Sequence, residues 1–181
     1  APKDPRGRQL AWDQLKAADL ATLLQDARPA VRERATQTLA KRAKNRGVEE
    51  SDEIVKTLSD TLRHKSPATR EQAVWTLARI DSAAARAEIR TALADNSDTV
   101  RQAALHAVSL WRDEAALPQL RDLLASNQPT HLRLAAEAIG RIGDKASVPA
   151  LLTAIERLGL QTGESIGTTA SANDRFLDHA L

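Results

Sequence analysis

The sequence repeats itself with a step of 31 residues, and this repeat constrains the fold more than any other feature. Four ladders of aliphatic or small residues keep the step. They are Leu58, Ile89, Leu120 and Leu151; Leu62, Leu93, Leu124 and Ile155; Ala73, Ala104 and Ala135; and Leu77, Val108 and Ile139. The first two ladders lie four residues apart, as do the last two, and this spacing places each pair on one helix face. Each repeat therefore predicts two amphipathic helices that can bury their apolar stripes only against neighbours.

The first repeat lies 38 residues upstream of the second, so it carries a seven-residue insertion near residues 44–50. Gly47 predicts that this insertion is a loop, with the next helix starting after Ser51. Other helix starts are marked by residues that favour a first turn or an N-cap. Second helices are predicted to begin at Pro29, Pro67, Ser97 and Pro129, and Pro118 and Pro149 fall in first turns of first helices.

These patterns predict an all-α protein, a right-handed α-solenoid of about five helix pairs and about ten helices. Residues 1–16 form a short lead, and residues 17–181 form the repeat domain. The repeats are expected at about 17–46, 51–80, 83–112, 114–143 and 145–181, the last one cut short and interrupted by a Gly/Ser/Thr-rich loop over 159–172.

Composition supports packed helices and excludes several other classes. Hydrophobic residues make up 42% of the chain but aromatic residues only 2%, so the core must consist of Leu, Ile, Val and Ala. There is no Cys, and no run of 18 apolar residues that could span a membrane. The chain opens at Ala1 and contains no Met, and its final residues read as a helix without an end cap. We therefore expect it to be a segment of a longer protein.

The repeats resemble HEAT repeats. An acid stands six positions before a base around the turn within a repeat, as Asp26 before Arg32 and Asp95 before Arg101. In HEAT proteins such residues form a hydrogen-bonded ladder between neighbouring repeats. The second repeat has His64 before Arg70, and the fourth has Ser126 before Leu132. We expect the ladder to be interrupted there.

Two narrower resemblances refine this assignment. Residues 139–152 resemble the short HEAT variant named after phycobilisome lyases, which implies a repeat shape and not lyase activity. Residues 4–15, 28–32 and 174–181 resemble the HEAT region of bacterial proteins that combine a dehydrogenase-like propeller, HEAT repeats and a C-terminal c-type cytochrome domain. That resemblance implies an internal segment of an extracytoplasmic (periplasmic) redox protein; a cytoplasmic location stays open. No haem motif is present in these residues, so no cofactor is predicted for this segment.

Motifs for catalysis are absent from the sequence. His64, His106, His131 and His179 have no spacing that suits a zinc or iron site. No nucleophile elbow, P-loop or dinucleotide fingerprint occurs. We therefore predict that this segment has no catalytic residue and no metal site. We predict instead that it is a protein-interaction or spacer scaffold whose partner is another protein or a flanking domain of the same chain. The oligomeric state is left open.

Two rows of second-helix positions are predicted to face away from the first helices, on the surface that is concave in HEAT stacks. They are Gln37, Trp75, His106 and Glu137, and, four residues further on, Lys41, Arg79, Leu110 and Arg141. Trp75 is the preferred binding anchor, because Trp and Arg dominate interface hot spots. The alternative is that Trp75 packs as part of the core.

A basic run on the second helix of the first repeat raises a nucleic-acid alternative. It comprises Arg28, Arg32, Arg34, Lys41, Arg42, Lys44 and Arg46. HEAT-like DNA glycosylases hold a duplex on such a basic face. A net charge of only +2, an acidic stretch over 49–60 and few aromatic residues for base stacking disfavour this reading. A solvated helix face is the plainer interpretation.

Overall fold

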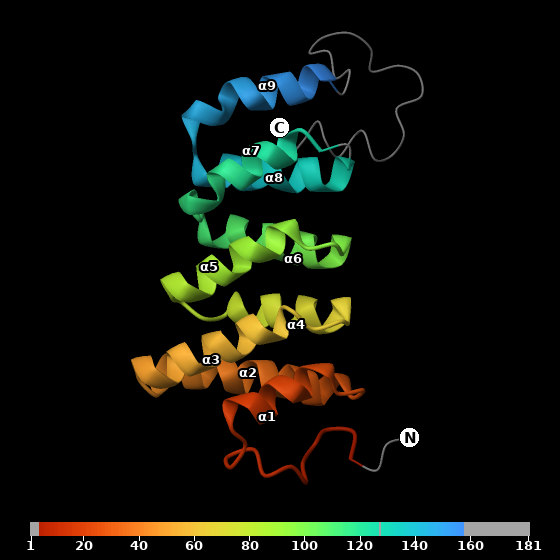
Figure 1. Ribbon diagram of the computed structural model, residues 1–181, viewed down its shortest axis with the longest axis vertical. Helices are drawn as coiled ribbons and strands as arrows, with labels where there is room; N and C mark the ends of the chain where they lie inside the picture. The colour runs from red at the N-terminus through yellow and green to blue at the C-terminus, as the bar shows by residue number, and fades with distance from the viewer. Residues whose placement is uncertain (1–3, 127, 158–181) are drawn as a thin grey trace. The chain divides into compact units, whose positions relative to one another are not determined.

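The computed structural model describes residues 4–126 and 128–157 (Figure 1). In these ranges the chain forms nine α-helices, four short 3-10 turns and no strand. The α-helices are α1 (Ala17–Thr22), α2 (Pro29–Asn45), α3 (Val48–Thr61), α4 (Pro67–Leu77), α5 (Ala83–Thr91), α6 (Asp98–Trp111), α7 (Leu117–Leu124), α8 (Pro129–Ile142) and α9 (Val148–Arg157). The predicted all-α solenoid is confirmed. The expected loop over 159–172 and the final helix lie outside the described residues.

The chain divides into two compact units, Ala1–Ala104 and Leu105–Leu181, and the division falls inside α6. In the first unit, α1 packs on α3 and α3 on α5, while α2 packs on α4. First and second helices therefore form two layers, as the alternating ladders predict. Leu58, Ala73 and Leu77 are fully buried between the layers.

The second unit contains the end of α6 and helices α7, α8 and α9. Helix α7 packs against α8 and against α9. Ladder residues Leu120, Ala135 and Ile139 are at most 1% exposed. Their burial repeats the pattern of the first unit with the same residue types.

Helix starts follow the predicted markers closely. Pro29, Pro67 and Pro129 are the first residues of α2, α4 and α8. Pro118 and Pro149 occupy the second position of α7 and α9. A Pro at these positions costs no hydrogen bond, because the first amides of a helix have no partner within the helix.

The predicted loop over 44–50 is wrong. Helix α2 continues to Asn45 and α3 already begins at Val48, so the insertion lengthens two helices and the chain breaks at Gly47. The predicted start after Ser51 is therefore too late. Charges explain the difference: Lys44 lies in the last turn of α2 and Glu49 in the first turn of α3, where each interacts favourably with the helix dipole.

The lead before α1 is folded onto the first repeat. Trp12 is 6% exposed, and its indole N–H donates to the carbonyl oxygen of Gly7 at 2.7 Å. The guanidinium of Arg42, in α2, donates to the carbonyl oxygens of Trp12 at 2.9 Å and Leu15 at 2.5 Å. The lead therefore packs on the first repeat, and its Trp12 is part of the core.

Candidate protein-interaction surface

Three of the eight predicted binding residues lie on two packed helices of the first unit, and a fourth lies in the turn after the second of them. Gln37 and Lys41 are exposed on α2, Trp75 on α4 is half-buried, and Arg79 is exposed just after α4, which ends at Leu77. The two helices are tied together below this row, because the hydroxyls of Thr36 and Thr76 lie 3.2 Å apart and the Gln72 amide donates to Thr36 at 2.9 Å. We call the face formed by Gln37, Lys41, Trp75 and Arg79 the α2/α4 surface.

The described polar contacts of Gln37 and Arg79 on the α2/α4 surface both go to Glu33. The amide of Gln37 donates to Glu33 at 2.8 Å, and Arg79 lies 3.8 Å from the same carboxylate with both side chains about half exposed. An exposed pair of this kind is worth about 0–1 kcal/mol, so a partner can replace it at low cost. The indole N–H of Trp75 donates to a carboxylate oxygen of Glu71 at 3.4 Å.

The other four predicted residues belong to the second unit. His106 is exposed on α6, and Leu110 is 55% exposed one turn later. On α8, Arg141 is exposed and lies 3.3 Å from the carboxylate of the half-buried Glu137. Each unit therefore contains four of the eight residues, all of them on second helices except Arg79, and a single continuous patch stays a prediction.

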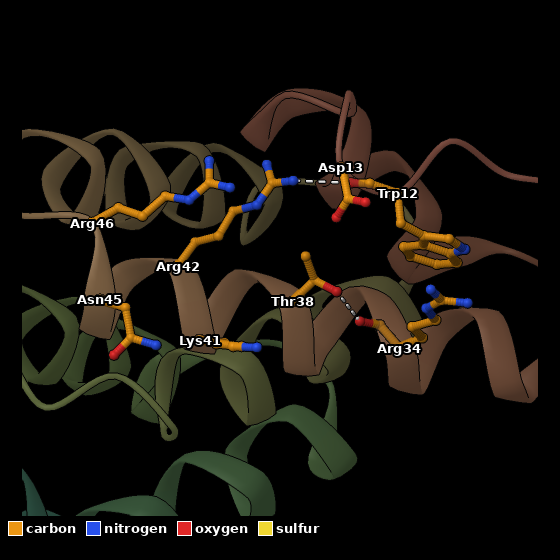
Figure 2. A pocket seen from close by; sticks show the side chains of 8 residues that line it. All are labelled: Trp12, Asp13, Arg34, Thr38, Lys41, Arg42, Asn45 and Arg46. Atoms are coloured by element: carbon orange, nitrogen blue, oxygen red, sulfur yellow. Dashed lines mark hydrogen bonds between the residues drawn. The ribbon is translucent and has the colours of Figure 1, made fainter.

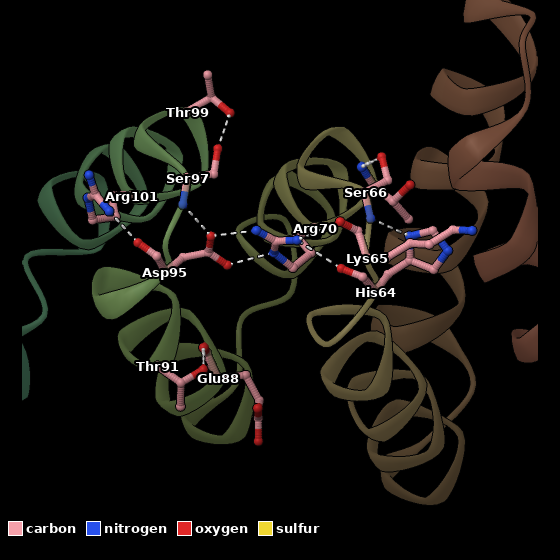
Figure 3. Close-up of polar contacts among 11 residues, drawn as sticks. His64, Lys65, Ser66, Arg70, Glu88, Thr91, Asp95, Ser97, Thr99 and Arg101 are labelled. Atoms are coloured by element: carbon pink, nitrogen blue, oxygen red, sulfur yellow. Dashed lines mark hydrogen bonds and ion pairs between the residues drawn. The ribbon is translucent and has the colours of Figure 1, made fainter.

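The predicted ladder residues make their main contact with the backbone. Arg32 donates to the carbonyl oxygen of Asp26 at 2.7 Å, and Arg101 donates to that of Asp95. Arg70 makes the same bond to the carbonyl oxygen of His64 at 2.8 Å (Figure 3). Because any residue offers a carbonyl, this bond does not need an acid six positions before the arginine.

One inter-repeat rung of the ladder is formed between the second and third repeats. Nε of Arg70 lies 2.7 Å from Oδ2 of Asp95, and Nη2 lies 2.7 Å from Oδ1, so the pair is bidentate (Figure 3). The expectation that the ladder is interrupted at Arg70 is therefore wrong. A rung joins the arginine of one repeat to the acid of the next, so His64 affects the joint with the first repeat and not the joint at Arg70.

Hydrogen bonds from arginine side chains lower the pKa of both ladder carboxyls, Asp26 and Asp95. Hydrogen bonds from the Arg28 guanidinium lower the pKa of Asp26 to about 2. Hydrogen bonds from Arg70 lower the pKa of Asp95, with a further contribution from the Ser97 amide. Both acids are therefore stabilised as carboxylates, and their role is to join the turns of the fold.

The second unit has a rung that the acid-to-base spacing did not reveal. Arg121 in α7 donates to Asp144 at 2.6 Å and to the hydroxyl of Ser147 at 2.7 Å. Hydrogen bonds from Ser147 and then from Arg121 lower the pKa of Asp144. Arg157 in α9 donates to the carbonyl oxygen of Leu124 at 2.6 Å. These arginines lie on first helices, so a search confined to the turn before the second helix cannot find them.

Most of the basic run is used in internal contacts. Arg28 pairs with Asp26 at 2.8 Å, Arg32 bonds the backbone, and Arg42 is 8% exposed and holds the lead. Arg46 lies 3.4 Å from Glu50. The row of cations seen in the sequence is therefore not a row of free charges in the fold.

A basic pocket of about 210 Å³ lies between α2 and the lead (Figure 2). Its lining residues come from α2 and from two adjacent positions of the lead. They are Trp12, Asp13, Arg34, Thr38, Lys41, Arg42, Asn45 and Arg46. The sequence signal for it is the spacing of Arg34, Thr38, Lys41 and Asn45, which puts them on one stripe of α2. The lead's position across that stripe was not predictable from the spacing.

In residues 4–126 and 128–157, no three His, Cys, Asp or Glu side chains gather as metal ligands would. His64, His106 and His131 are on separate elements, and His179 is outside these ranges. None of the described helices is long and apolar enough to cross a membrane. The absence of a metal or cofactor in this segment stays a prediction.

The fold defines a class of protein, the all-α helical-repeat solenoid. A family model for HEAT repeats matches residues 17–109 and 88–157. The chain therefore belongs to the HEAT-repeat family. Comparison with curated proteins finds no match.

Solved structures with the same fold include both designed and natural proteins. A computationally designed armadillo repeat protein for modular peptide recognition is 20% identical, with a TM-score of 0.51 over 91% of this chain and 80% of the other. Human deoxyhypusine hydroxylase in complex with glycerol is 19% identical, with a TM-score of 0.53 over 91% of this chain and 70% of the other. An engineered protein has 19% identity and a TM-score of 0.51, covering 91% and 77% of the two chains. At these identities the likeness establishes the fold.

Proposed function

We propose that this HEAT segment is a non-catalytic interaction scaffold that binds an extended segment of a protein partner along its second helices. The α2/α4 surface carries the proposal, because half-buried Trp75 on α4 belongs to one face with the exposed Gln37 and Lys41 of the packed helix α2 and with exposed Arg79 just after α4. Trp and Arg are the side chains that most often supply binding energy in interfaces. The helices beneath are held by a buried core, so little backbone must be ordered when a partner binds.

The structural neighbours support the binding role at the level of the fold. The designed armadillo protein is described as built for modular peptide recognition, and it shares the layered helical repeat. The deoxyhypusine hydroxylase shows that the same fold can also belong to an enzyme. In the described residues of this chain, no three His, Cys, Asp or Glu side chains gather as metal ligands would.

We further propose that the segment acts as a spacer in a larger extracytoplasmic redox protein that contains a c-type cytochrome domain. The support is the sequence resemblance of residues 4–15 and 28–32. Covalent haem staining of the native protein and measurement of its intact mass test this context. A native protein that has the mass of this chain alone and carries no covalent haem refutes it.

Binding of nucleic acid is the alternative function, and the structure removes much of its basis. A Lys or Arg side chain contributes to nucleic-acid binding when its charge is free to neutralise a phosphate and release the counterion held there. Arg28 and Arg42 are instead engaged with Asp26 and with backbone carbonyls. The protein-interaction function is therefore the better supported of the two.

The test is a selection of peptides from a random library on the purified chain, followed by affinity measurements on the enriched sequences. We expect Trp75→Ala to weaken binding by about tenfold or more, Trp75→Phe to restore part of it, and Arg79→Ala to weaken it less. Arg63→Ala is the matched control, because Arg63 is an exposed arginine that follows α3. Thermal unfolding of each variant separates lost binding from lost folding. Failure to enrich any peptide, or binding that is insensitive to both Trp75 and Arg79, contradicts the proposal.

A further inference from the structure

The pocket between α2 and the lead is lined by more cations than acids. Four cations and one acid line it, namely Arg34, Lys41, Arg42 and Arg46 against Asp13. Arg42 is buried and donates to the carbonyl oxygens of Trp12 and Leu15. The other three cations are exposed.

The exposed cations have weak partners or none in the described part of the chain. The guanidinium of Arg34 lies 4.4 Å from the centre of the Trp12 ring, and it makes no ion pair among the described residues. Both side chains are drawn in Figure 2. Lys41 likewise has no acidic partner within the residues described. Arg46 is 3.4 Å from Glu50, with its side chain 51% exposed. Their charge is therefore available to a ligand.

The wall of the pocket is held in place before any ligand binds. The Trp12 ring is packed at 6% exposure and its N–H is used by Gly7. Arg42 fixes the backbone of the lead at two carbonyls. Thr38 donates to the carbonyl of Arg34, which it follows on the same stripe of α2. Preorganised charges bind an anion at a lower entropic cost than mobile side chains do.

We infer that this pocket binds the carboxylates of an acidic protein segment, so that the partner of the scaffold is acidic where it meets the lead. This inference rests on the proposed function. Guanidinium groups match carboxylates in shape and can bind both oxygens at once. Lys41 belongs both to the pocket and to the α2/α4 surface, so one extended segment can contact both.

The lining favours carboxylates over nucleic acid. Single-stranded nucleic acid is bound by stacking bases on open aromatic rings. Trp12 is buried, and Arg34 lies over its ring, so it offers no such platform. Asp13 also stands in the wall, where it repels a densely charged phosphate backbone more than it repels a single carboxylate.

The experiment measures fluorescence anisotropy of labelled octaglutamate with the whole chain, at low salt and at physiological ionic strength. We expect the double variant Arg34→Gln/Lys41→Gln to weaken binding about tenfold, because each exposed charge contributes up to a few-fold. Lys56→Gln/Lys65→Gln is the matched control, because it removes the same charge from exposed positions outside the pocket and should leave affinity within about twofold. Asp13→Asn should tighten binding about threefold, which a variant that merely unfolds cannot do.

Three outcomes overturn the inference. Octaglutamate fails to bind at low salt, or both double variants weaken it equally, or Asp13→Asn leaves the affinity unchanged. A labelled single-stranded DNA octamer forms the comparison arm. If it binds more tightly than octaglutamate and loses affinity in Arg34→Gln/Lys41→Gln, the pocket is a phosphodiester site and the acidic-protein assignment is wrong. Peptides selected through Trp75 report on the proposed function separately, because Trp75 does not line this pocket.

Discussion

Replacing Gly7 by Ala should undo the attachment of the lead to the first repeat. A Cβ on Gly7 would lie 2.8 Å from Cγ2 of Val31 and 3.2 Å from both Leu10 and Trp12. Gly7 also has a φ of +61°, a conformation that side chains with a Cβ rarely adopt. The substitution therefore combines a backbone penalty with a steric clash against packed side chains.

Each contribution has a rough magnitude. The left-handed backbone costs about 1–2 kcal/mol for a residue with a Cβ, and an additional carbon in a packed core costs about 1–3 kcal/mol. We expect a loss of about 2–4 kcal/mol if the lead stays attached. If the lead detaches, the loss in global stability is limited to the free energy of its docking, and the Trp12 indole N–H loses its bond to Gly7.

Urea unfolding monitored by circular dichroism measures the loss in global stability. Hydrogen exchange of the Trp12 indole N–H measures whether the lead has detached. Gly143→Ala is the control, because Gly143 has a φ of +81° but no described atom lies within 4 Å of its added Cβ. It should cost about 1 kcal/mol from the backbone alone. The reasoning is refuted if Gly7→Ala costs no more than Gly143→Ala and also leaves indole exchange unchanged.

Three further predictions concern stability. Arg70→Ala should lower the free energy of unfolding in urea by about 2–3 kcal/mol, because its bidentate pair with Asp95 is only 12–14% exposed. Arg63→Ala is the control: its pair with Asp60 is 66–75% exposed, so the free energy of unfolding should change by less than about 0.5 kcal/mol. Similar losses in the two variants would contradict this prediction. Because Asp26 and Asp95 have lowered pKa values in the fold, their contribution to stability should be complete above about pH 5 and should be lost as the pH falls through about 4 toward 2. Urea midpoints measured across that range check the slope, and a flat profile would count against it. Gly140→Ala should raise the melting temperature through a gain of about 0.5–1 kcal/mol, because Gly140 lies inside α8 and no described atom crowds its Cβ position; a lower melting temperature would show hidden crowding.

Sequence position alone predicts only some of the exposed residues on the candidate surfaces. Gln37 and Lys41 are exposed on their second helix, as the spacing of the ladders predicts, whereas Arg79 is exposed but lies just after the end of α4. Arg42 was assigned to the same basic run, yet it is 8% exposed and bonded to two carbonyls of the lead. Residues in a continuous run point in all directions around a helix, so their availability depends on what packs on each side.

The sequence by itself determined the repeat, the two helices in each unit, their Pro-marked starts and the family. These features are local or periodic, since helix faces follow from spacing and the buried stripes Leu58, Leu77, Leu120 and Ile139 repeat at constant intervals. The tertiary structure decided that the lead folds over α2 and that a basic pocket forms beside Trp12. Such contacts join residues that no fixed interval relates, so they depend on how the elements pack, and a periodic pattern carries no information about them.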